Sequence, residues 1–266
     1  MEIIVCVKPV LDPDLPPVKF AVDARSNRVL PPEGMPPVIN PYDALAVEAA
    51  LRIKEAKKTG KVTVLTVGDA AADGVIRKTL AMGADEAVLL SDPAFAESDG
   101  FATARILARA IQKLGKYDLI LCGRQAADWD QGIVGSALAE FLGLPAVTRA
   151  RALEAGEGKI RVDRVVSSGA ETFEVALPAL VTVSSEFGQA RIPSGWGIIK
   201  AAKKPIPAWG AAQVEADPAA VGKAGARNSL VKLFIPSYQR KCEILTGETP
   251  AEAAAKLAEK IAGFKA

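Results

Sequence analysis

The residues best suited to chemistry lie together between Asp118 and Val134, in the segment DLILCGRQAADWDQGIV. Leu119 to Leu121 form a short apolar run, typical of a strand buried on both faces, and Gly123 lets another molecule approach the backbone. Ligands of open α/β sheets bind at such strand ends. A helix that starts near Asp130 would direct its free N–H groups and positive dipole end toward a phosphate. The segment therefore predicts a nucleotide site, with an ordinary strand-to-helix loop as the alternative.

The residue types of the chain exclude several kinds of catalysis. The 266 residues include no histidine, so Ser-His-Asp or Cys-His groups and a histidine-ligated metal or haem are excluded. Cys6, Cys122 and Cys242 lie far apart without a CxxC motif, which argues against a zinc site and a disulfide framework. Cys6 and Cys122 are expected as small core residues. We expect no metal ligand and no catalytic residue, so redox chemistry would come from a bound cofactor.

Composition and charge narrow the class of protein further. Half of the chain is hydrophobic and 5% is aromatic, which predicts a globular protein of one large or two modest domains. The net charge of +2 gives no reason to expect a nucleic-acid partner. No apolar run has the length of a membrane span, and MEIIVCVKPV at the start is typical of a first strand rather than a signal peptide. We expect a cytoplasmic protein without direct membrane insertion, or one of the mitochondrial matrix if a transit peptide is missing.

Strand-like and helix-like segments alternate from residue 2 to residue 142. Such alternation predicts an α/β fold with a mostly parallel, doubly wound, Rossmann-like sheet and helices on both faces. The expected strands are Glu2–Val7, Val62–Val67, Ala87–Leu90 and the run before Gly123, and the expected helices are Ala44–Lys57, Ala71–Met82, Phe101–Leu114 and Gly132–Phe141.

The pattern changes after Pro145. Lys159–Val166 alternates polar and apolar residues and Thr172–Val183 follows a short Ser-Ser-Gly turn, which predicts an antiparallel hairpin added to the sheet and then a return into it. Gly188–Gly225 is rich in Gly, Pro and Ala, and we interpret it as an extended arm that must lie on something. Pro250–Phe264 is predicted as a final amphipathic helix.

Two parts follow from this pattern: an α/β nucleotide-binding domain, 1–186, and a recognition loop with an extended C-terminal arm, 187–266. Because the arm exposes tryptophan and leucine without a core of its own, it predicts packing on a partner subunit. A flexible tail is the alternative.

Four segments, taken in order, resemble one family. They are NPYD (Asn40 to Asp43) opening the helix ALAVEAALRIKE, IRKTLAMGADEAVLL (Ile76 to Leu90), CGRQAADWD (Cys122 to Asp130) and ARIPSGWGIIKAAKKP (Ala190 to Pro205). Together they resemble the β subunit of electron transfer flavoprotein. The resemblance implies an adenine-nucleotide-binding fold, a heterodimer with an α subunit that holds most of a redox FAD near the interface, and electron transfer from a flavin dehydrogenase to a quinone oxidoreductase or another acceptor.

The resemblance also implies a second nucleotide, usually AMP, buried in the β subunit. Its expected neighbours are strand ends, the start of the first helix and the phosphate-side loop, which runs from Gly123 to Val134. They are Cys6, Asn40, Pro41, Tyr42, Asp43, Val67, Gly123, Arg124, Gln125, Ala126, Ala127, Asp128, Trp129, Asp130, Gln131, Gly132, Ile133 and Val134.

Several of these residues also have ordinary structural interpretations. Asn40 contacts a base or ribose, or it caps its helix. Asp43 suits the positive end of that helix with or without a ligand. Asp128 and Asp130 are phosphate-side residues, or they are loop or cap carboxylates. Trp129 closes the mouth of the pocket or packs under the loop.

The phosphate-side loop departs from the AMP-binding pattern. Gly132, Ile133 and Val134 stand where AMP-binding members resembling this chain carry Asn-Gln-Thr, so backbone N–H groups or Arg124 would replace those side chains. Members with a second FAD, which bifurcate electrons from NADH, share the Val-Gly at the end of the run but differ at Trp129, Gln131 and Ile133. The nucleotide is therefore AMP or a second FAD, with AMP preferred.

The expected docking segment departs as well. Family members project a leucine into the partner dehydrogenase, and Gly195 occupies the aligned position. Ile192 or Trp196 would replace it, since buried aromatic and aliphatic side chains anchor small interfaces. Our hypothesis is that Trp196 is the anchor, which implies a dehydrogenase other than the usual acyl-CoA type. A basic cluster suited to an acidic partner, or a solvated face, is formed by Arg191, Lys200, Lys203 and Lys204.

The predicted role is therefore that of an electron carrier subunit without acid–base chemistry of its own. An NADH-linked, electron-bifurcating flavoprotein is the alternative. An ATP-binding or ATP-hydrolysing protein of the same fold is a further alternative, although the glycine-rich loop that such proteins use for the outer phosphates is absent from the sequence.

Overall fold

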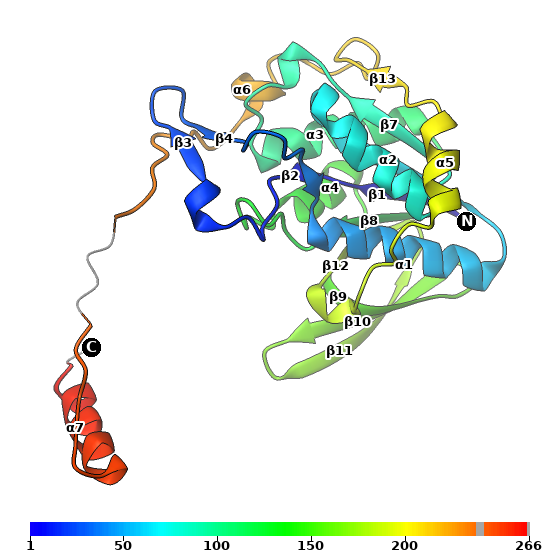
Figure 1. Cartoon of the computed structure of the whole chain (residues 1–266). Coiled ribbons are helices and arrows are strands. Elements are labelled where there is room, and N and C mark those ends of the chain that lie inside the picture. Colours follow the sequence, from blue (N-terminus) through cyan, green and yellow to red (C-terminus); the bar gives the residue numbers. More distant parts are fainter. Residues whose placement is uncertain (238–241, 265–266) are drawn as a thin grey trace. The chain divides into compact units, whose positions relative to one another are not determined.

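The computed structural model describes residues 1–237 and 242–264, and a nine-stranded sheet organises most of them (Figure 1). The strand order is β11-β10-β9-β12-β8-β1-β6-β7-β13. All neighbours from β9 to β13 in that order pair in parallel, whereas β9, β10 and β11 pair antiparallel. The strands are β1 Glu2–Cys6, β6 Lys61–Val67, β7 Glu86–Leu90, β8 Leu119–Gly123, β9 Ala146–Ala155, β10 Lys159–Val166, β11 Gly169–Ala176, β12 Ala179–Val183 and β13 Ala208–Trp209. The predicted parallel sheet with an antiparallel addition is confirmed.

The helices lie on both faces of this sheet (Figure 1). Residues of α1 and α2 share one buried cluster with one face, and residues of α3 and α4 share another with the opposite face. The helices are α1 Pro41–Lys57, α2 Asp73–Met82, α3 Gly100–Leu114, α4 Val134–Leu142, α5 Gly195–Lys203, α6 Gly222–Gly225 and α7 Pro250–Gly263, with short 3₁₀ turns at Pro17–Lys19, Ala70–Ala72, Pro93–Phe95 and Ser185–Phe187.

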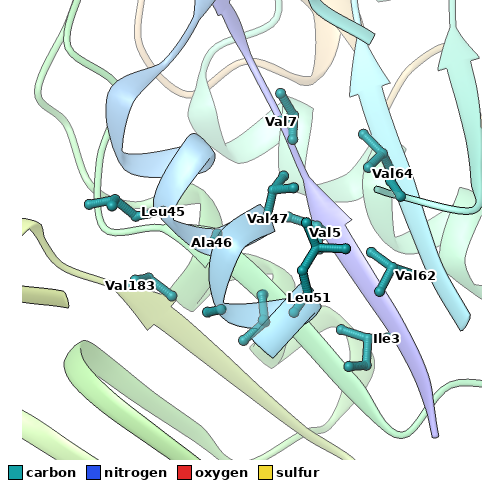
Figure 2. Close-up of a cluster of buried hydrophobic side chains, with 14 of the residues drawn as sticks. Ile3, Val5, Val7, Leu45, Ala46, Val47, Leu51, Val62, Val64 and Val183 are labelled. Carbon is teal, nitrogen blue, oxygen red and sulfur yellow. The ribbon is translucent and has the colours of Figure 1, made fainter. Parts of the chain in front are cut away.

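The central strand β1 shows why the sheet is covered on both sides. Ile3 and Val5 belong to the cluster under α1, while Ile4 and Cys6 belong to the cluster on the other face. Successive side chains of a strand point to opposite faces, so an unbroken apolar run is buried only between two layers. Figure 2 shows the first cluster, in which Val47 of α1 lies against β1.

Two small antiparallel pairs lie outside the large sheet, and the sequence did not predict them. β2 Pro9–Val10 pairs with β5 Val38–Ile39, and β3 Ala21–Asp23 pairs with β4 Arg28–Leu30. The first pair brings the chain after β1 back to the start of α1, since Asn40 N–H donates to the carbonyl of Lys8 at 3.0 Å.

Helix starts differ from the predicted ones for local backbone reasons. α1 begins at Pro41 rather than Ala44, because proline's fixed φ and missing N–H suit the first helical position. α4 begins at Val134, later than the predicted start at Asp130 or Gly132. Both of these residues have positive φ, 50° and 65°, which interrupts a right-handed helix.

The prediction that Gly188–Gly225 forms an extended arm was wrong. This segment contains α5, α6 and β13, and β13 extends the sheet beside β7. Gly197 fits α5 closely onto α2, because a Cβ there would lie 2.4 Å from the carbonyl oxygen of Ala81. Many small residues allow such close packing, although their composition alone is typical of an irregular segment.

Two other predictions also need correction. β9 was not predicted, and the predicted run Thr172–Val183 is interrupted between β11 and β12. The interruption includes Pro178, which cannot donate a ladder hydrogen bond.

The chain divides into two units, Met1–Leu233 and Phe234–Ala266, so the boundary lies later than the expected one at residue 187. In the second unit, Thr249 Oγ1 accepts a hydrogen bond from Glu252 N–H at 3.3 Å and caps α7. The predicted face of this helix is exposed, with Leu257 50% and Ile261 60% accessible. Residues 238–241 and 265–266 of the expected arm lie outside the described residues.

Among the described residues, no helix is long and apolar enough to cross a membrane. The same residues contain no group of three or more Cys, Asp or Glu side chains arranged to hold a metal ion. Cys6 and Cys122 are buried in the core as expected, in register on neighbouring strands.

Candidate nucleotide site and docking segment

The strand order changes direction between β1 and β8. From β1 the chain builds β6 and β7 on one side, and it then crosses to β8 and β12 on the other side. Ligands of open α/β sheets bind at the carboxyl ends of the two strands that flank such a switch point. Here those ends are Cys6 and Gly123, and Val67 ends β6 at the same edge. The three predicted strand-end positions are therefore brought to one edge of the sheet.

Asp43, in the first turn of α1, joins the two strand ends. Its Oδ1 accepts a hydrogen bond from Gly123 N–H at 3.0 Å, and its Oδ2 accepts one from Lys8 N–H at 2.7 Å. A Cβ at position 123 would lie 2.4 Å from Asp43 Oδ1 and 2.7 Å from Tyr42 Cβ. The glycine therefore admits the start of α1, which is a closer neighbour than the sequence analysis considered.

Burial dominates the ionisation of Asp43. The residue is 6% exposed, and burial raises the pKa of its carboxyl group to about 7. Hydrogen bonds from the backbone of Lys8, the side chain of Asn40 and the backbone of Gly123 act in the opposite direction. Asp43 has no ion-pair partner within the described part of the chain, so these dipoles only partly replace lost hydration.

Asn40 holds the phosphate-side loop. It is 1% exposed, its Nδ2 donates to the Gln125 carbonyl at 2.8 Å, and its Oδ1 accepts from Ala127 N–H at 3.1 Å. Asn40 is the N-cap residue of α1 by position, but its side chain makes no capping hydrogen bond to that helix. Contact of Asn40 with a base or ribose stays a prediction.

The phosphate-side loop is held by polar side chains. Lys8 Nζ lies 2.6 Å from Asp128 Oδ2, and Gln125 Nε2 donates to Asp130 Oδ1 at 2.6 Å. Arg124 Nε in turn donates to Gln125 Oε1 at 2.9 Å. Asp128 and Asp130 are thus loop carboxylates, not caps of α4, and their roles toward a ligand remain predictions.

The first turn of α4 offers backbone donors to an anion. Its N-cap residue, Ile133, makes no side-chain capping bond. Gly135 fits the helix closely over β12, because a Cβ there would lie 2.5 Å from Thr182 Cγ2. Uncapped N–H groups and the helix dipole favour negative charge. A phosphate contact at this helix end stays a prediction.

Two other predicted residues lie at the surface of this region. Trp129 is 50% exposed, and its role toward a nucleotide stays a prediction. Arg124 lies with its guanidinium 5.5 Å from the centre of the Tyr42 ring. The hollow lined by Met1, Lys57, Asp118 and Pro178 lies at the amino-end edge of β1 and β8, away from the predicted site.

The docking segment, residues 188–204, uses two of its four predicted cations inside the chain. Arg191 makes ion pairs with Glu48 and Glu55 of α1. Lys204 Nζ donates to the carbonyl oxygens of Ala84 and Asp85 at 2.7 and 2.9 Å. The predicted cluster of four outward cations is wrong for Arg191 and Lys204. Lys203 is exposed, and Lys200 Nζ lies 5.7 Å from the centre of the Trp196 ring.

The apolar side of the docking segment is exposed. Ile192 is 91% and Trp196 is 66% accessible, and Gly195 has open space around it. Ile198 and Ile199, at 56% and 53%, extend this surface and were missed by the sequence analysis. The Ser194 side chain caps α5 by accepting a hydrogen bond from Gly197 N–H at 3.1 Å. Recognising this serine as a helix cap in the sequence would have placed Ile198 and Ile199 on a helix.

Known proteins resemble the chain over nearly its whole length. A family model described as the electron transfer flavoprotein domain matches residues 31–214. The chain is 41% identical over 262 residues to an electron transfer flavoprotein subunit beta of Thermoanaerobacterium thermosaccharolyticum, covering 98% of each chain. It is 40% identical over 261 residues to the caffeyl-CoA reductase-Etf complex subunit CarD of Acetobacterium woodii, also covering 98% of each. The loop after β8 and the docking segment lie within the residues that the family model matches.

Proposed function

The chain belongs to the electron transfer flavoprotein β-subunit family, and on that premise we propose that it pairs with an α-type subunit that holds FAD near the interface. Its role is electron transfer. The observation that carries the proposal is the match over 98% of the chain to a β subunit. The exposed apolar face of α7, in a unit with little core of its own, supports packing on the α-type subunit.

We propose that a nucleotide, with AMP preferred, binds at the carboxyl ends of β1 and β8 beside the start of α1, the position of the ligand crevice in open α/β sheets. The apolar strand ends there suit an adenine, and Lys8, Arg124 and the first turn of α4 suit a phosphate. FAD supplies the redox chemistry when it is bound. The residues of this chain are proposed to bind and orient the nucleotide.

The docking segment is proposed to receive a flavin dehydrogenase, with Trp196 as the anchor. Trp196 and Ile192 are the large exposed side chains on either side of Gly195, and a desolvated aromatic side chain is a common hot spot. Lys200 and Lys203 supply the positive charge that would steer an acidic partner. A quinone oxidoreductase or another acceptor would then receive the electrons from the α-held FAD.

A second candidate function is electron bifurcation from NADH, with FAD instead of AMP in the crevice. The relative CarD is named as a subunit of a caffeyl-CoA reductase-Etf complex, and this name supports the alternative. The loop of this chain ends Ile133-Val134-Gly135 and so lacks the side-chain donors expected for AMP. These two observations favour the alternative over an ATP-hydrolysing protein.

The nucleotide content of the assembled complex separates these functions. The chain is co-expressed with its α-type partner, and FAD and AMP are quantified after release from the purified heterodimer. One FAD and one AMP per heterodimer support the carrier, whereas two FAD and no AMP support the bifurcating alternative. A complex without FAD contradicts both. Gly123→Ala, which displaces the start of α1, should lower the content of the nucleotide at this site while FAD in the α-type subunit remains.

A further inference from the structure

Glu48 is a carboxylate buried in the middle of α1. It is 4% exposed, so it cannot touch another protein. Its Oε1 accepts from Arg52 Nε at 2.7 Å, and its Oε2 accepts from Arg191 Nε at 2.7 Å and from Arg191 N–H at 3.2 Å. A buried charge persists in a fold only when partners of this kind compensate it.

Arg191 is directed toward α1 rather than toward solvent. Its guanidinium bridges two carboxylates, with Nε on Glu48 and Nη2 on Glu55 Oε2 at 3.0 Å. A second donor, Nη1, also contacts Glu55. The planar fork of arginine fits this double contact, whereas the single ammonium of lysine reaches one carboxylate well.

The same part of α1 holds the residues just before Arg191. Arg52 Nη2 donates to the Gln189 carbonyl at 3.3 Å, and its guanidinium lies 4.9 Å from the centre of the Phe187 ring. Residues 187–191 are therefore fixed to α1 by side-chain contacts. The next residue, Ile192, is 91% exposed. Arg191 is thus bound to α1, whereas the adjacent residue Ile192 is exposed to solvent.

We propose that Glu48 and Arg191 are positioning residues, which fix the docking segment to α1 and thereby present Ile192 and Trp196 to the partner dehydrogenase. This inference rests on the proposed docking function of residues 188–204. It assigns Arg191 an intramolecular role in place of steering. It also makes a buried residue, Glu48, a determinant of an interaction that it does not touch.

The burial of Glu48 also separates positioning from direct contact. If Arg191 acted on the partner as a charge, replacing Glu48 would leave docking intact, because Arg191 would remain. If Arg191 acts through α1, Glu48→Gln and Arg191→Lys should weaken docking together. Lys203→Gln removes an exposed cation of the same segment and serves as the comparison for electrostatic steering.

The experiment uses the co-purified heterodimer and the flavin dehydrogenase that is isolated by its ability to reduce the wild-type complex. KM for the heterodimer as electron acceptor, kcat, the salt dependence of KM and flavin content are measured for each variant. Hydrogen–deuterium exchange of residues 188–194 is measured on the same samples. Lys61→Gln, which removes the Lys61–Glu86 ion pair and leaves both ion pairs of Arg191 in place, is the matched control.

Glu48→Gln and Arg191→Lys should each raise KM about tenfold, with kcat, flavin content and the salt dependence of KM unchanged. Exchange in residues 188–194 should become about tenfold faster. Lys203→Gln should instead change the salt dependence, and Lys61→Gln should change neither quantity. Unchanged KM in folded Glu48→Gln overturns the proposal, as does a KM increase in Arg191→Lys that vanishes at high salt.

Two further outcomes are assigned in advance. If Glu48→Gln does not yield a flavin-loaded heterodimer, Glu55→Gln replaces it, because Glu55 is exposed and holds the other side of the Arg191 fork. If no flavin dehydrogenase reduces the wild-type heterodimer, the docking function has failed. Hydrogen exchange then still decides whether Glu48 and Arg191 fix the segment, and unchanged exchange in Arg191→Lys overturns that part as well.

Discussion

Asp43 and Glu48 are buried carboxylates of the same helix, and their pKa values are shifted in opposite directions. Asp43 is 6% exposed and its pKa is raised to about 7 by burial. Glu48 is 4% exposed, and burial also works to raise its pKa, but hydrogen bonds from Arg191 and Arg52 hold it below its ordinary value. The difference lies in the partners, since Asp43 accepts from backbone N–H groups and Glu48 from two guanidinium groups.

The two carboxylates also serve different regions. Asp43 ties the start of α1 to the strand ends of the proposed nucleotide crevice. Glu48 ties the middle of α1 to the docking segment. One helix therefore carries both proposed sites, using backbone dipoles where a nucleotide would bind and an ion-pair network where a protein would bind. A buried carboxylate paired with cations depends on those cations more strongly than one paired with backbone dipoles.

The largest predicted loss follows from removing the cation that faces Glu48. Arg191→Met leaves this buried carboxylate with Arg52 alone and should lower the free energy of unfolding by about 3 kcal/mol. Urea denaturation of the isolated chain measures the change. The double variant Glu48→Gln/Arg191→Met should lose less than the sum of the two single variants, because the uncompensated charge is gone. Strict additivity would contradict the ion-pair interpretation.

The contact of Asp43 with the end of β8 predicts a smaller loss in the free energy of unfolding. Gly123→Ala places a Cβ 2.4 Å from Asp43 Oδ1, so α1 must shift away from β8. Overpacking of this kind should cost about 2 kcal/mol, again measured by urea denaturation. Gly195→Ala is the matched control, because a Cβ there meets open space. Equal effects of the two substitutions would show that the contact with α1 does not require a glycine at position 123.

Opposite pKa shifts predict opposite dependence of stability on pH. The folded pKa of Asp43 lies above its unfolded value, so the folded chain binds more protons at this site and stability falls as pH rises from about 4 to 7. Between pH 5 and pH 6 the contribution of Asp43 should fall by about 1 kcal/mol. The lowered pKa of Glu48 instead gives stability that is lost as pH falls through its folded value.

Substitution isolates each contribution. Asp43→Asn should remove the decline between pH 5 and pH 6, and Glu48→Gln should remove part of the loss at acid pH. Denaturation curves of the wild type and both variants are compared from acid pH, below the ordinary pKa of a glutamate, up to pH 7. A wild-type minus Asp43→Asn difference that does not change with pH would show that Asp43 is already ionised at pH 5.

How far the sequence could predict this molecule depended on which interactions define each element. The parallel strands up to β8 and the helices α1 to α4 were predictable, because apolar runs and helical periodicity mark buried faces locally. α5 and β13 were not, because close contacts such as Gly197 with Ala81 depend on residues far along the chain. The same limit applied to Arg191, whose partners in α1 are distant in sequence. Its charge was visible, but its direction was not.

The nucleotide crevice shows the same division. The family motifs identified Asn40, Asp43 and the loop after Gly123, and the fold brings them together. Their partners in the chain were not predictable, because a sequence does not distinguish an asparagine that caps its own helix from one that holds a loop. Asn40 uses both polar atoms of its side chain on Gln125 and Ala127.

The smallest effect on stability is predicted where the docking segment faces outward. Trp196 is 66% exposed, so Trp196→Ala should change the free energy of unfolding by less than about 0.5 kcal/mol. The dehydrogenase should nevertheless bind the heterodimer much more weakly, because an anchor side chain contributes free energy only in the complex with the partner. Steady-state KM measures this loss, and Ile198→Ala, on the same exposed helix, tests whether any apolar truncation has the same effect. The outward residue would then affect docking without affecting stability, whereas Arg191 affects both. If Trp196→Ala leaves reduction unchanged, the held segment presents a different anchor, and Ile192 is the next side chain to replace.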